Sequence, residues 1–438
     1  MAWFRALFLG VCACSLVGGL VSPGGVADYL SDDYFPGLHL LAPRPDSGLI
    51  EVFKDGRRPR ETCVDDDAGL INACRSSRRN CHGHVPSNCA RALNQSGRFS
   101  CKEFVVVANG SQQLAQQVES FCCRSCNAGY KSIHVEGAAN WRNMVEARAA
   151  LEVALQIPMR EPLQQPWGIF SMQGKRLTKL EELLAAEVAF LILVGQWMWP
   201  AVRVGFQQTA EGVLDGAPLT LRTLSVRPVV FQVDGFIRPE EAEVVIGLGG
   251  ELDMQNSEGL LITQDLEADR AHDSFRTSTQ TWLTNDMSPI VAQLDERTSN
   301  LTRIPPDHNE EVQLLHYMPG QFYHAHNDWA YLPDYNGQAS EWRRHFYGWR
   351  DRLATLFWYL NDVDGGETVF PMQGNVICEG ISADCEGAIH ADPESCDTGL
   401  KIVPRRGSVV LWYNFHADGR GDHNALHGGC PPQPGSEK

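Results

Sequence analysis

The spacing of apolar residues along the chain changes near residue 226. In 140–155 and 177–193, apolar residues recur every three or four positions within segments rich in Ala, Leu and Glu, which predicts helices. After residue 226, short runs of β-branched and aromatic residues alternate with turn-forming residues, which predicts strands. These runs are 227–237, 311–318, 352–362, 400–404 and 407–415. Pro239, followed by two glutamates, predicts one helix among the strands, at 238–249.

This pattern predicts a chain that is mainly β with flanking helices. Several strands with few helices are typical of a β-sandwich or jelly-roll, so we expect that fold in the second half. A chain of 438 residues is too long for one ordinary domain. The expected parts are a signal segment at 1–27, a cysteine-rich disulfide module at 28–130, a helical linker region at 131–225 and the β domain at 226–438.

Composition and charge narrow the class of partner. Hydrophobic residues make up 43% of the chain and charged residues 21%, which is typical of a globular protein. The formal net charge is −17, so the surface repels phosphate backbones. The basic run at 56–60 is short and reads as a solvated loop. We therefore expect no nucleic-acid partner.

The first 27 residues have the features of a secretory signal. Arg5 precedes an uncharged stretch, and Gly25 and Ala27 offer small residues before a cleavage site at Asp28. The alternative is an uncleaved membrane anchor, and membrane attachment is expected only in that case. A second uncharged run, 188–202, is shorter than the roughly 20 residues that a bilayer requires, so we expect buried core there.

Cysteine usage agrees with a secretory route. Of the 14 cysteines, eight lie within 63–126, and an even cluster of this kind in a secreted chain indicates a disulfide framework whose pairing the sequence does not determine. Zinc binding is the alternative, but the cluster holds a single CxxC, from Cys123 to Cys126. Glycosylation sequons occur at Asn94, Asn109 and Asn300.

Three His-x-Asp triplets are candidate metal ligands. An iron(II) site that activates oxygen needs two imidazoles and one carboxylate on one face of the ion, and a strand can supply two of them from positions i and i+2. The pair His390/Asp392 lies in a polar insertion, and His416/Asp418 lies in a Gly/Asp turn. Only the third pair, His326/Asp328, follows a strand-like run and has a distant histidine, His427, beyond further strands. These patterns alone leave its metal role open.

Longer motifs carry a family resemblance over about 227–438. The segments LLHYMPGQFYHAHND, LATLFWYLNDVDGGETVFP and VPRRGSVVLWYN, followed by ALHGGCP, occur in this order. Together they resemble the catalytic domain of prolyl 4-hydroxylases, the Fe(II)/2-oxoglutarate dioxygenases that hydroxylate proline, and especially the transmembrane and protist or algal branches. The resemblance implies a double-stranded β-helix, or jelly-roll, with Fe(II), 2-oxoglutarate, O₂ and ascorbate as cofactors.

The resemblance also implies residue roles. It assigns iron to His326, Asp328 and His427. It assigns 2-oxoglutarate to Tyr317, Thr368 and Lys438. It assigns the peptide to Arg276, Ser278, Tyr323 and Arg352. His324 is then no ligand, and it either lines the cleft or faces solvent. Tyr323, Trp329 and Trp358 are candidates for an aromatic groove, with core packing favoured for Trp358.

The sequence departs from the family pattern near Lys438. Relatives carry a lysine ten residues after the second histidine, which pairs with the far carboxylate of 2-oxoglutarate, but Glu437 occupies that position here. Because a glutamate would repel the dicarboxylate, we expect Lys438, one residue later, to take the role. The tryptophan and last strand of the family pattern do not follow within the sequence, so we expect the domain to lack its C-terminal strand.

The expected function is 4-hydroxylation of peptidyl proline in collagen-like or hydroxyproline-rich proteins, in the endoplasmic reticulum lumen or elsewhere in the secretory pathway. Proline-rich peptides are extended before they bind, so docking them into an aromatic groove costs little ordering entropy. Two alternatives stay open at this point. The chain could hydroxylate another peptide residue, or it could be a secreted binding module whose dioxygenase domain is inactive.

Overall fold

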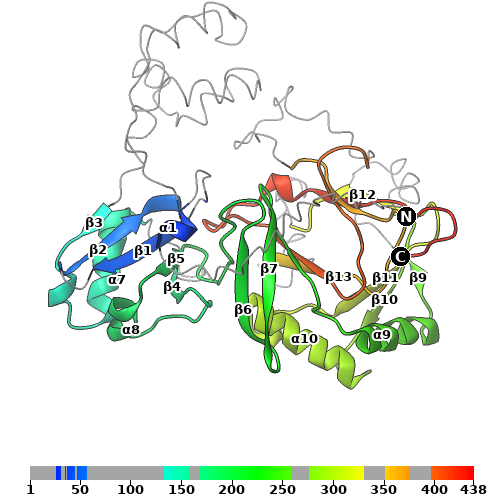
Figure 1. Cartoon of the computed structure of the whole chain (residues 1–438), viewed down its shortest axis with the longest axis horizontal. Coiled ribbons are helices and arrows are strands. Elements are labelled where there is room, and N and C mark those ends of the chain that lie inside the picture. Colours follow the sequence, from blue (N-terminus) through cyan, green and yellow to red (C-terminus); the bar gives the residue numbers. More distant parts are fainter. Residues whose placement is uncertain are drawn as a thin grey trace, which may run out of the picture.

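The computed structural model describes residues 26–30, 35, 37–44, 47–56, 133–157, 167–257, 276–329, 351–373 and 396–438. Most of the predicted signal segment and all eight cysteines of the predicted module lie outside these residues, as do Asn94, Asn109 and the pair His390/Asp392. The described residues form a smaller N-terminal unit and a larger β unit, with the long β6–β7 hairpin between them (Figure 1).

The N-terminal unit is built on an antiparallel sheet with the strand order β3-β2-β1-β5-β4. Its strands are β1 (Leu38–Arg44), β2 (Leu49–Phe53), β3 (Ile133–Val135), β4 (Gly168–Ser171) and β5 (Ala189–Ile192). Its helices are α1 (Val26–Tyr29), α7 (Met144–Leu155) and α8 (Leu180–Ala185), with 3₁₀ turns η1 (Lys54–Gly56) and η4 (Ala138–Asn140). This part of the chain therefore mixes strands and helices, which corrects the expectation of a helical linker at 131–225.

Strand β5 explains why the sequence pattern misled. Phe190 and Ile192 pack into the core shared with the β unit, whereas Ala189 and Leu191 pack against the core beneath α7 and α8. A strand buried on both faces is continuously apolar, and a short apolar run of this kind does not separate strand from helix by periodicity. The helix expected at 177–193 is therefore helical only in α8. The helix expected at 140–155 is confirmed as α7, which begins where the Asn143 side chain accepts a hydrogen bond from Glu146 N.

The β unit contains three further antiparallel sheets. Its strands are β6 (Gln207–Leu214), β7 (Ala217–Val226), β8 (Val229–Val233), β9 (Gln255–Asn256), β10 (Thr279–Leu283), β11 (Val312–His316), β12 (Tyr323–His326), β13 (Ala354–Trp358), β14 (Thr368–Phe370), β15 (Leu400–Ile402), β16 (Val409–Tyr413) and β17 (His427–Gly429). The sheet orders are β11-β10-β9, β12-β17-β14-β15 and β13-β16-β8-β7-β6. The mainly β prediction is confirmed.

Strands β11 to β17 alternate between sheets as they do in a jelly-roll. One sheet has the order β12-β17-β14-β15, and β13 pairs with β16 in another. If β11 is counted as strand 1, these orders are 2-7-4-5 and 3-6. A ribbon of antiparallel strands that folds over on itself gives this order. The expected boundary at 225/226 falls one residue before the end of β7, but β7 pairs with β8, so the sheet extends across the boundary back to β6.

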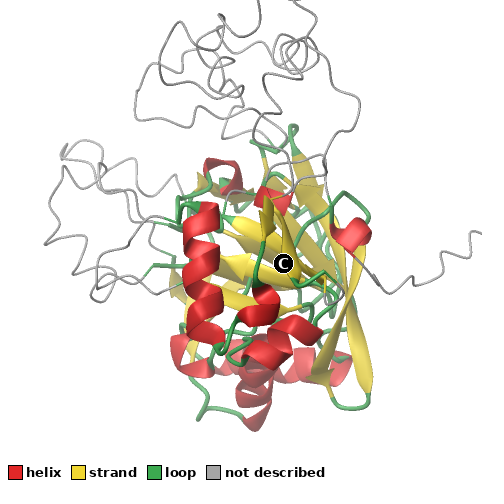
Figure 2. Cartoon of the chain, turned by 90° about the vertical axis from the view of Figure 1, so that its left-hand side faces the viewer, coloured by secondary structure: helices red, strands yellow, loops and turns green. Residues whose placement is uncertain are grey.

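Helices lie outside these sheets (Figure 2). They are α9 (Pro239–Glu251) and α10 (Pro289–Thr302), with 3₁₀ turns η6 (Pro306–His308) and η8 (His423–Ala425). The helix expected at 238–249 is confirmed as α9, with Pro239 as its first residue. A buried ion pair joins α9 to α10, because Arg297 donates from both terminal nitrogens to Glu241, at 2.8 and 2.7 Å, and also to the Phe236 carbonyl.

Replacing Glu241 with alanine is expected to lower the free energy of unfolding by about 3–5 kcal/mol, because Arg297 would remain buried without its partner. Urea denaturation followed by circular dichroism measures this change. Glu240→Ala is the matched control, since Glu240 is exposed on the same helical turn, and it should change stability by less than about 0.5 kcal/mol. Equal effects of the two substitutions would contradict the assignment.

The two units share one hydrophobic core. The Tyr413 hydroxyl accepts a hydrogen bond from the Trp199 backbone N at 2.8 Å, and the Trp199 indole donates to the Leu301 carbonyl at 2.9 Å. Trp197 and Trp199 are both buried, so the prediction that 188–202 forms core is confirmed. Gly37 is needed at this junction, because a Cβ there would lie 2.5 Å from the Asp418 backbone N. The N-terminal unit therefore packs directly on the loop that follows β16.

Two described features bear on the secretory expectation. Cys396 and Cys430 form a disulfide, which links the segment before β15 to the residue after β17. Asn300, one of the three sequons, is half-buried within α10. None of the helices in the described ranges is long and apolar enough to cross a membrane.

Candidate metal centre

Strands β12 and β17 bring two histidines together. The strands run antiparallel, and His326 lies directly opposite His427 in the register, with ring centroids 4.5 Å apart. Close approach of the two backbones requires Gly428, since a Cβ there would lie 2.9 Å from the Tyr323 carbonyl oxygen. The local sequence therefore sets the separation of the two imidazoles.

Asp328 completes a group of three. It follows β12 by two residues, and its carboxylate oxygens lie 3.6 Å from His326 Nε2 and 3.5 Å from His427 Nε2. One ligand atom from each of the three residues lies within 4.8 Å of the others. Ligands about 2.1 Å from a shared metal ion are about 3 Å apart, so a small contraction around an ion would satisfy the geometry. The donor set fits a non-haem iron(II) ion.

Backbone carbonyls select the imidazole tautomer at both histidines. His326 Nδ1 lies 2.9 Å from the His324 carbonyl oxygen, and His427 Nδ1 lies 2.8 Å from the Ala425 carbonyl oxygen. A carbonyl only accepts hydrogen bonds, so each Nδ1 must carry the proton. Each Nε2 then keeps its lone pair, on the side that faces Asp328.

The protonation states suit a cation. Burial, together with the neighbouring His427, lowers the pKa of His326 to about 3, which keeps that imidazole neutral. Burial opposes ionisation of Asp328, but His427, His326, Arg352 and a Thr355 hydrogen bond outweigh it and hold the pKa of Asp328 below its ordinary value. A neutral His326 imidazole and an ionised Asp328 carboxylate are therefore present where a metal ion would bind.

The other histidines of the sequence motifs are placed elsewhere. His324 is half-buried, and its ring lies 4.5 Å from the Phe322 ring. His416 Nε2 lies 3.8 Å from an Asp422 oxygen, and Asp418 accepts from Arg420 in the same turn. Among the described residues, the group of His326, Asp328 and His427 is the one cluster with metal-ligand spacing.

A cage of aromatic rings surrounds the Lys438 ammonium. Its Nζ lies 5.2, 5.1 and 5.7 Å from the ring centroids of Tyr317, Phe357 and Tyr359. Burial lowers the pKa of Lys438 to about 7. Backbone hydrogen bonds in both directions join Lys438 to Tyr317. The buried Tyr359 hydroxyl donates to Thr368 Oγ1 at 2.7 Å. Of the three residues predicted for the cosubstrate, Tyr317 and Lys438 line one cavity, and Thr368 contacts the cage through Tyr359.

Glu437 points to a different place. Its carboxylate lies 3.2 Å from His316 Nε2, on the exposed side of β11. The backbone alternation between neighbouring residues thus directs Lys438 inward and Glu437 outward. This placement supports the expectation that Lys438, rather than Glu437, faces the cosubstrate.

The residues predicted for the peptide stack beside the metal centre. The Tyr323 ring stacks on His326 with centroids 3.7 Å apart, and the Arg276 guanidinium lies 4.3 Å from the Tyr323 centroid. Ser278 accepts from Arg276 Nε at 3.4 Å and donates to Ser257 Oγ at 3.1 Å. Arg276, Ser278 and Tyr323 therefore form one continuous layer.

The fourth predicted peptide residue, Arg352, is held by a partner that the sequence did not suggest. Its Nε and Nη2 donate to the two carboxylate oxygens of Glu310, at 2.8 and 3.0 Å. Asn309, the preceding residue, is anchored to Asp295 and Ser299, at 2.7 and 2.9 Å. This anchoring fixes the segment that carries Glu310.

Aromatic candidates divide between the core and the site. Trp329 is buried, with its ring 5.0 Å from His423 and 6.0 Å from Phe415. Trp358 is half-buried and packs against the main core, as expected. Of the three groove candidates, Tyr323 is the one that stacks on a metal-site residue.

Sequence reasoning missed Thr355, Phe357 and Tyr359. Thr355 and Phe357 occupy alternate positions of β13, and Tyr359 continues the same alternation one residue after the strand ends. Thr355 reaches Asp328, and the other two contact Lys438. Period-two alternation in the predicted strand 352–362 was a signal that could have found them. Glu310 and Asn414 had no such signal, because their contacts join distant segments.

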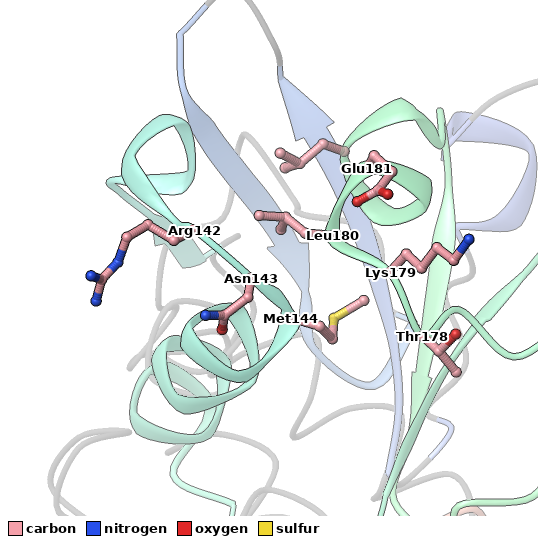
Figure 3. Close-up of a pocket in the computed structure, with 8 residues that line it drawn as sticks. Arg142, Asn143, Met144, Thr178, Lys179, Leu180 and Glu181 are labelled. Carbon is pink, nitrogen blue, oxygen red and sulfur yellow. The ribbon is translucent and has the colours of Figure 1, made fainter.

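The metal centre and the lysine cage open into one cavity of about 1130 Å³, which Asp328, Arg352, Thr355, Tyr317 and Lys438 help to line. A smaller cavity of about 360 Å³ lies between the starts of α7 and α8 (Figure 3). Its Arg142 already pairs with Glu146, and its lining residues include no histidine or cysteine. The larger cavity is therefore the candidate active site.

The comparisons agree with this site. The family model described as the 2OG-Fe(II) oxygenase superfamily matches residues 312–438. "Probable prolyl 4-hydroxylase 6" of Arabidopsis thaliana is 31% identical over 229 residues, which cover 52% of this chain and 72% of that protein. "Probable prolyl 4-hydroxylase 8" of the same plant is 32% identical over 215 residues, covering 48% and 66%.

Solved structures were also found. The viral collagen prolyl hydroxylase of Paramecium Bursaria Chlorella virus-1, in its 2OG complex, is 21% identical with a TM-score of 0.30, covering 48% of this chain and 91% of that one. A Pseudomonas putida prolyl-4-hydroxylase is 16% identical with a TM-score of 0.28, covering 48% and 88%.

Sheet order, metal-ligand group and family model together define a 2-oxoglutarate- and Fe(II)-dependent oxygenase. Fe(II), 2-oxoglutarate and O₂ are its cofactors and cosubstrates, as predicted. Within that superfamily, the chain belongs to the prolyl 4-hydroxylase family. The predicted enzyme class is thereby confirmed, while the role of ascorbate stays a prediction.

Proposed function

We propose that this chain hydroxylates proline in peptides at C4, using Fe(II), 2-oxoglutarate and O₂. The observation that carries the proposal is the meeting of His326, Asp328 and His427 in a chain of the prolyl 4-hydroxylase family. A ferrous ion bound there couples oxidative decarboxylation of 2-oxoglutarate to C–H hydroxylation. Collagen-like or hydroxyproline-rich proteins are the proposed substrates.

Each metal-site residue has a defined task. His326 and His427 offer their Nε2 atoms as donors, and Asp328 offers a carboxylate that would lower the net charge of a bound ion. Three protein ligands would leave coordination positions on a bound ferrous ion free for a keto acid and O₂. The three ligand side chains thus set the position at which a keto acid and O₂ would meet.

We propose that Lys438 binds the far carboxylate of 2-oxoglutarate. Its ammonium is the cation enclosed by Tyr317, Phe357 and Tyr359, inside the cavity that Asp328 also lines. Thr368 and Tyr317 have hydroxyl groups in the same region. In a site of low dielectric, a charge-assisted contact to a carboxylate is stronger than it would be in water.

The proposed peptide surface is the layer of Arg276, Ser278 and Tyr323, together with Arg352. The Tyr323 ring is close to the metal site and offers an aromatic face for a proline ring. Polyproline II peptides are already extended, so docking them requires little ordering. The cation–π contact from Arg276 fixes the Tyr323 ring before the peptide arrives.

We propose the secretory pathway, including the endoplasmic reticulum lumen, as the location. The support is the signal-like start of the sequence and its cluster of eight cysteines. The disulfide between Cys396 and Cys430 agrees with an oxidising compartment.

Succinate release from 2-oxoglutarate tests the proposed function. With Fe(II) and ascorbate, poly-proline or (Pro-Pro-Gly) repeat peptides should stimulate release, and mass spectrometry should locate the added oxygen on proline. Peptides with alanine in place of proline are the control. Stimulation by another residue, or by no peptide while metal and 2-oxoglutarate still bind, would contradict the proposal.

Affinity for 2-oxoglutarate is expected to fall as the pH rises above about 7. Burial lowers the pKa of Lys438 to about 7 in the free protein, and a bound dicarboxylate raises it again by favouring the charged form. Binding therefore takes up a proton above pH 7, and the dissociation constant should rise by up to about tenfold per pH unit there, with a plateau at lower pH. Calorimetric titration of the metal-loaded protein measures this dependence.

Lys438→Arg is the control for the pH dependence, because a guanidinium stays charged throughout this range. Its dissociation constant for 2-oxoglutarate should be nearly flat from pH 6.5 to 9. The assignment of the anchor to Lys438 would be contradicted by the same slope in both proteins.

A further inference from the structure

A hydrogen bond outside the metal-ligand group holds Asp328. Thr355 on β13 donates from Oγ1 to Asp328 Oδ2 at 2.6 Å, a short distance typical of a hydroxyl bonded to a charged carboxylate. The Thr355 hydroxyl also accepts from Asn414 Nδ2 at 3.0 Å. In turn, Asn414 Oδ1 accepts from the Trp412 indole Nε1 at 3.1 Å.

The Trp412 indole, at one end of this hydrogen-bond chain, fixes the orientation of the Asn414 amide. An indole N–H only donates, so the Asn414 atom that faces Trp412 must be the amide oxygen. The Asn414 nitrogen then faces Thr355 and donates to it. An ionised carboxylate only accepts, so the Thr355 hydroxyl, which accepts from Asn414, donates its single proton to Asp328. The carboxylate therefore receives a donor whose orientation the surrounding residues determine.

Strand register assembles the chain. Thr355 lies directly opposite Trp412 in the β13–β16 ladder. Asn414 follows β16, where its backbone N donates to the Leu353 carbonyl and its Nδ2 also donates to the Arg352 carbonyl at 3.1 Å. Trp412 and Asn414 are 1% and 0% exposed, so water does not compete for these bonds. The chain is a rigid part of the barrel.

We infer that the hydrogen-bond chain of Trp412, Asn414 and Thr355 positions Asp328 for metal binding. Thr355 holds Oδ2, and the two carboxylate oxygens lie 3.6 and 3.5 Å from the Nε2 atoms of His326 and His427. None of the three residues belongs to the metal-ligand group, so they act through Asp328. This inference rests on the proposed metal site and goes beyond it by assigning positioning residues.

The physical effect of the chain is on metal affinity. A carboxylate already held in one rotamer loses less conformational freedom when it binds an ion, and outer hydrogen-bond partners typically change metal affinity by about 10–100-fold. Holding one oxygen also keeps the carboxylate from occupying two coordination positions. The open positions that a keto acid and O₂ need are thereby preserved.

The test is direct titration of the apoprotein with Mn(II), an O₂-stable ion that accepts the same nitrogen and oxygen donors, followed by electron paramagnetic resonance. Thr355→Val keeps the shape of the side chain and removes the hydroxyl. Its dissociation constant for Mn(II) should rise by about 10–100-fold over that of the wild type. Thr302→Val, which removes a buried hydroxyl bond in α10, is the matched control and should bind Mn(II) as the wild type does.

A second pair of variants separates the hydroxyl from the packing of the methyl group. Thr355→Ser and Thr355→Ala both lose the methyl, but only serine keeps the donor. The Thr355→Ser protein should bind Mn(II) with an affinity within about threefold of the wild type. The Thr355→Ala protein should bind it as weakly as Thr355→Val does. This comparison also serves if the valine variant does not fold, as judged by circular dichroism.

Equal Mn(II) affinity in the serine and alanine variants, or unchanged affinity in a folded Thr355→Val protein, would overturn the inference. The proposed function fails differently. If the wild-type protein binds Mn(II) but Fe(II)-dependent turnover is not stimulated by proline peptides, the proline assignment is lost and the positioning role of Thr355 is still measurable.

Discussion

Replacing His326 with alanine is expected to abolish peptide-stimulated succinate release and to weaken metal binding by at least about 10³-fold. The site offers three protein ligands, and loss of one removes several kcal/mol of metal-ligand interaction, with each 1.4 kcal/mol worth a factor of ten. Mn(II) titration and succinate release measure the two effects separately. Both should be lost together, because His326 acts through the metal.

His416→Ala is the matched control for this experiment, since His416 begins a rival His-x-Asp motif but contacts Asp422 outside the ligand group. It should retain metal binding and turnover within about twofold. An intact metal site in His326→Ala, or a loss in His416→Ala equal to that in His326→Ala, would mean that the ligand set is assigned to the wrong residues.

Replacing Lys438 with alanine is expected to raise the dissociation constant for 2-oxoglutarate by roughly 10²–10³-fold, with metal affinity unchanged. Removing one partner of an enclosed ion pair costs about 3–5 kcal/mol, because the remaining carboxylate is desolvated without compensation. The change should appear in the KM for 2-oxoglutarate, and peptide affinity should stay close to the wild-type value.

Glu437→Gln distinguishes the two candidates for the anchor. The Glu437 carboxylate contacts His316 on the exposed side of β11, so its neutralisation should change 2-oxoglutarate affinity by less than about threefold. A large effect of Glu437→Gln, together with a small effect of Lys438→Ala, would reverse the assignment.

Much of the β unit could be predicted from sequence, because the composition and length of each strand segment indicate a strand without reference to distant residues. The strands at 311–318, 352–362, 400–404 and 407–415 have the composition and length of strands, and β11, β13, β15 and β16 lie within them. The two-residue spacing of His326 and Asp328 made them a candidate ligand pair, although β12 ends at His326 and Asp328 lies two residues beyond it. His427, 101 positions after His326, required the family resemblance, because no local pattern indicates which strands become neighbours.

The N-terminal unit could not be predicted in the same way. Its sheet joins 38–53 to 133–135, 168–171 and 189–192, and the pairing of Ile50 with Val135 and of Leu38 with Ile192 spans 85 and 154 residues of sequence. The apolar run of β5 is compatible with a helix or a strand, and burial on both faces decides for the strand. Tertiary packing therefore decided between helix and strand for β5, where local propensity allowed both.

Within the site, the residues in direct contact with ligands were easier to predict than those that hold them. Asp328 has a motif, whereas Asn414 and Glu310 act on Thr355 and Arg352 across 59 and 42 residues of sequence. Hydrogen bonds of this kind leave no periodicity in the chain. They become visible only when the strands are placed in register.

The central claim is that one iron ion binds between His326, Asp328 and His427. Diffraction at the iron absorption edge, from crystals grown without oxygen in Fe(II) and 2-oxoglutarate, measures this most directly. The account predicts one strong anomalous peak within bonding distance of both Nε2 atoms and an Asp328 oxygen. A peak at other side chains, or no peak in crystals that contain stoichiometric iron, would contradict it.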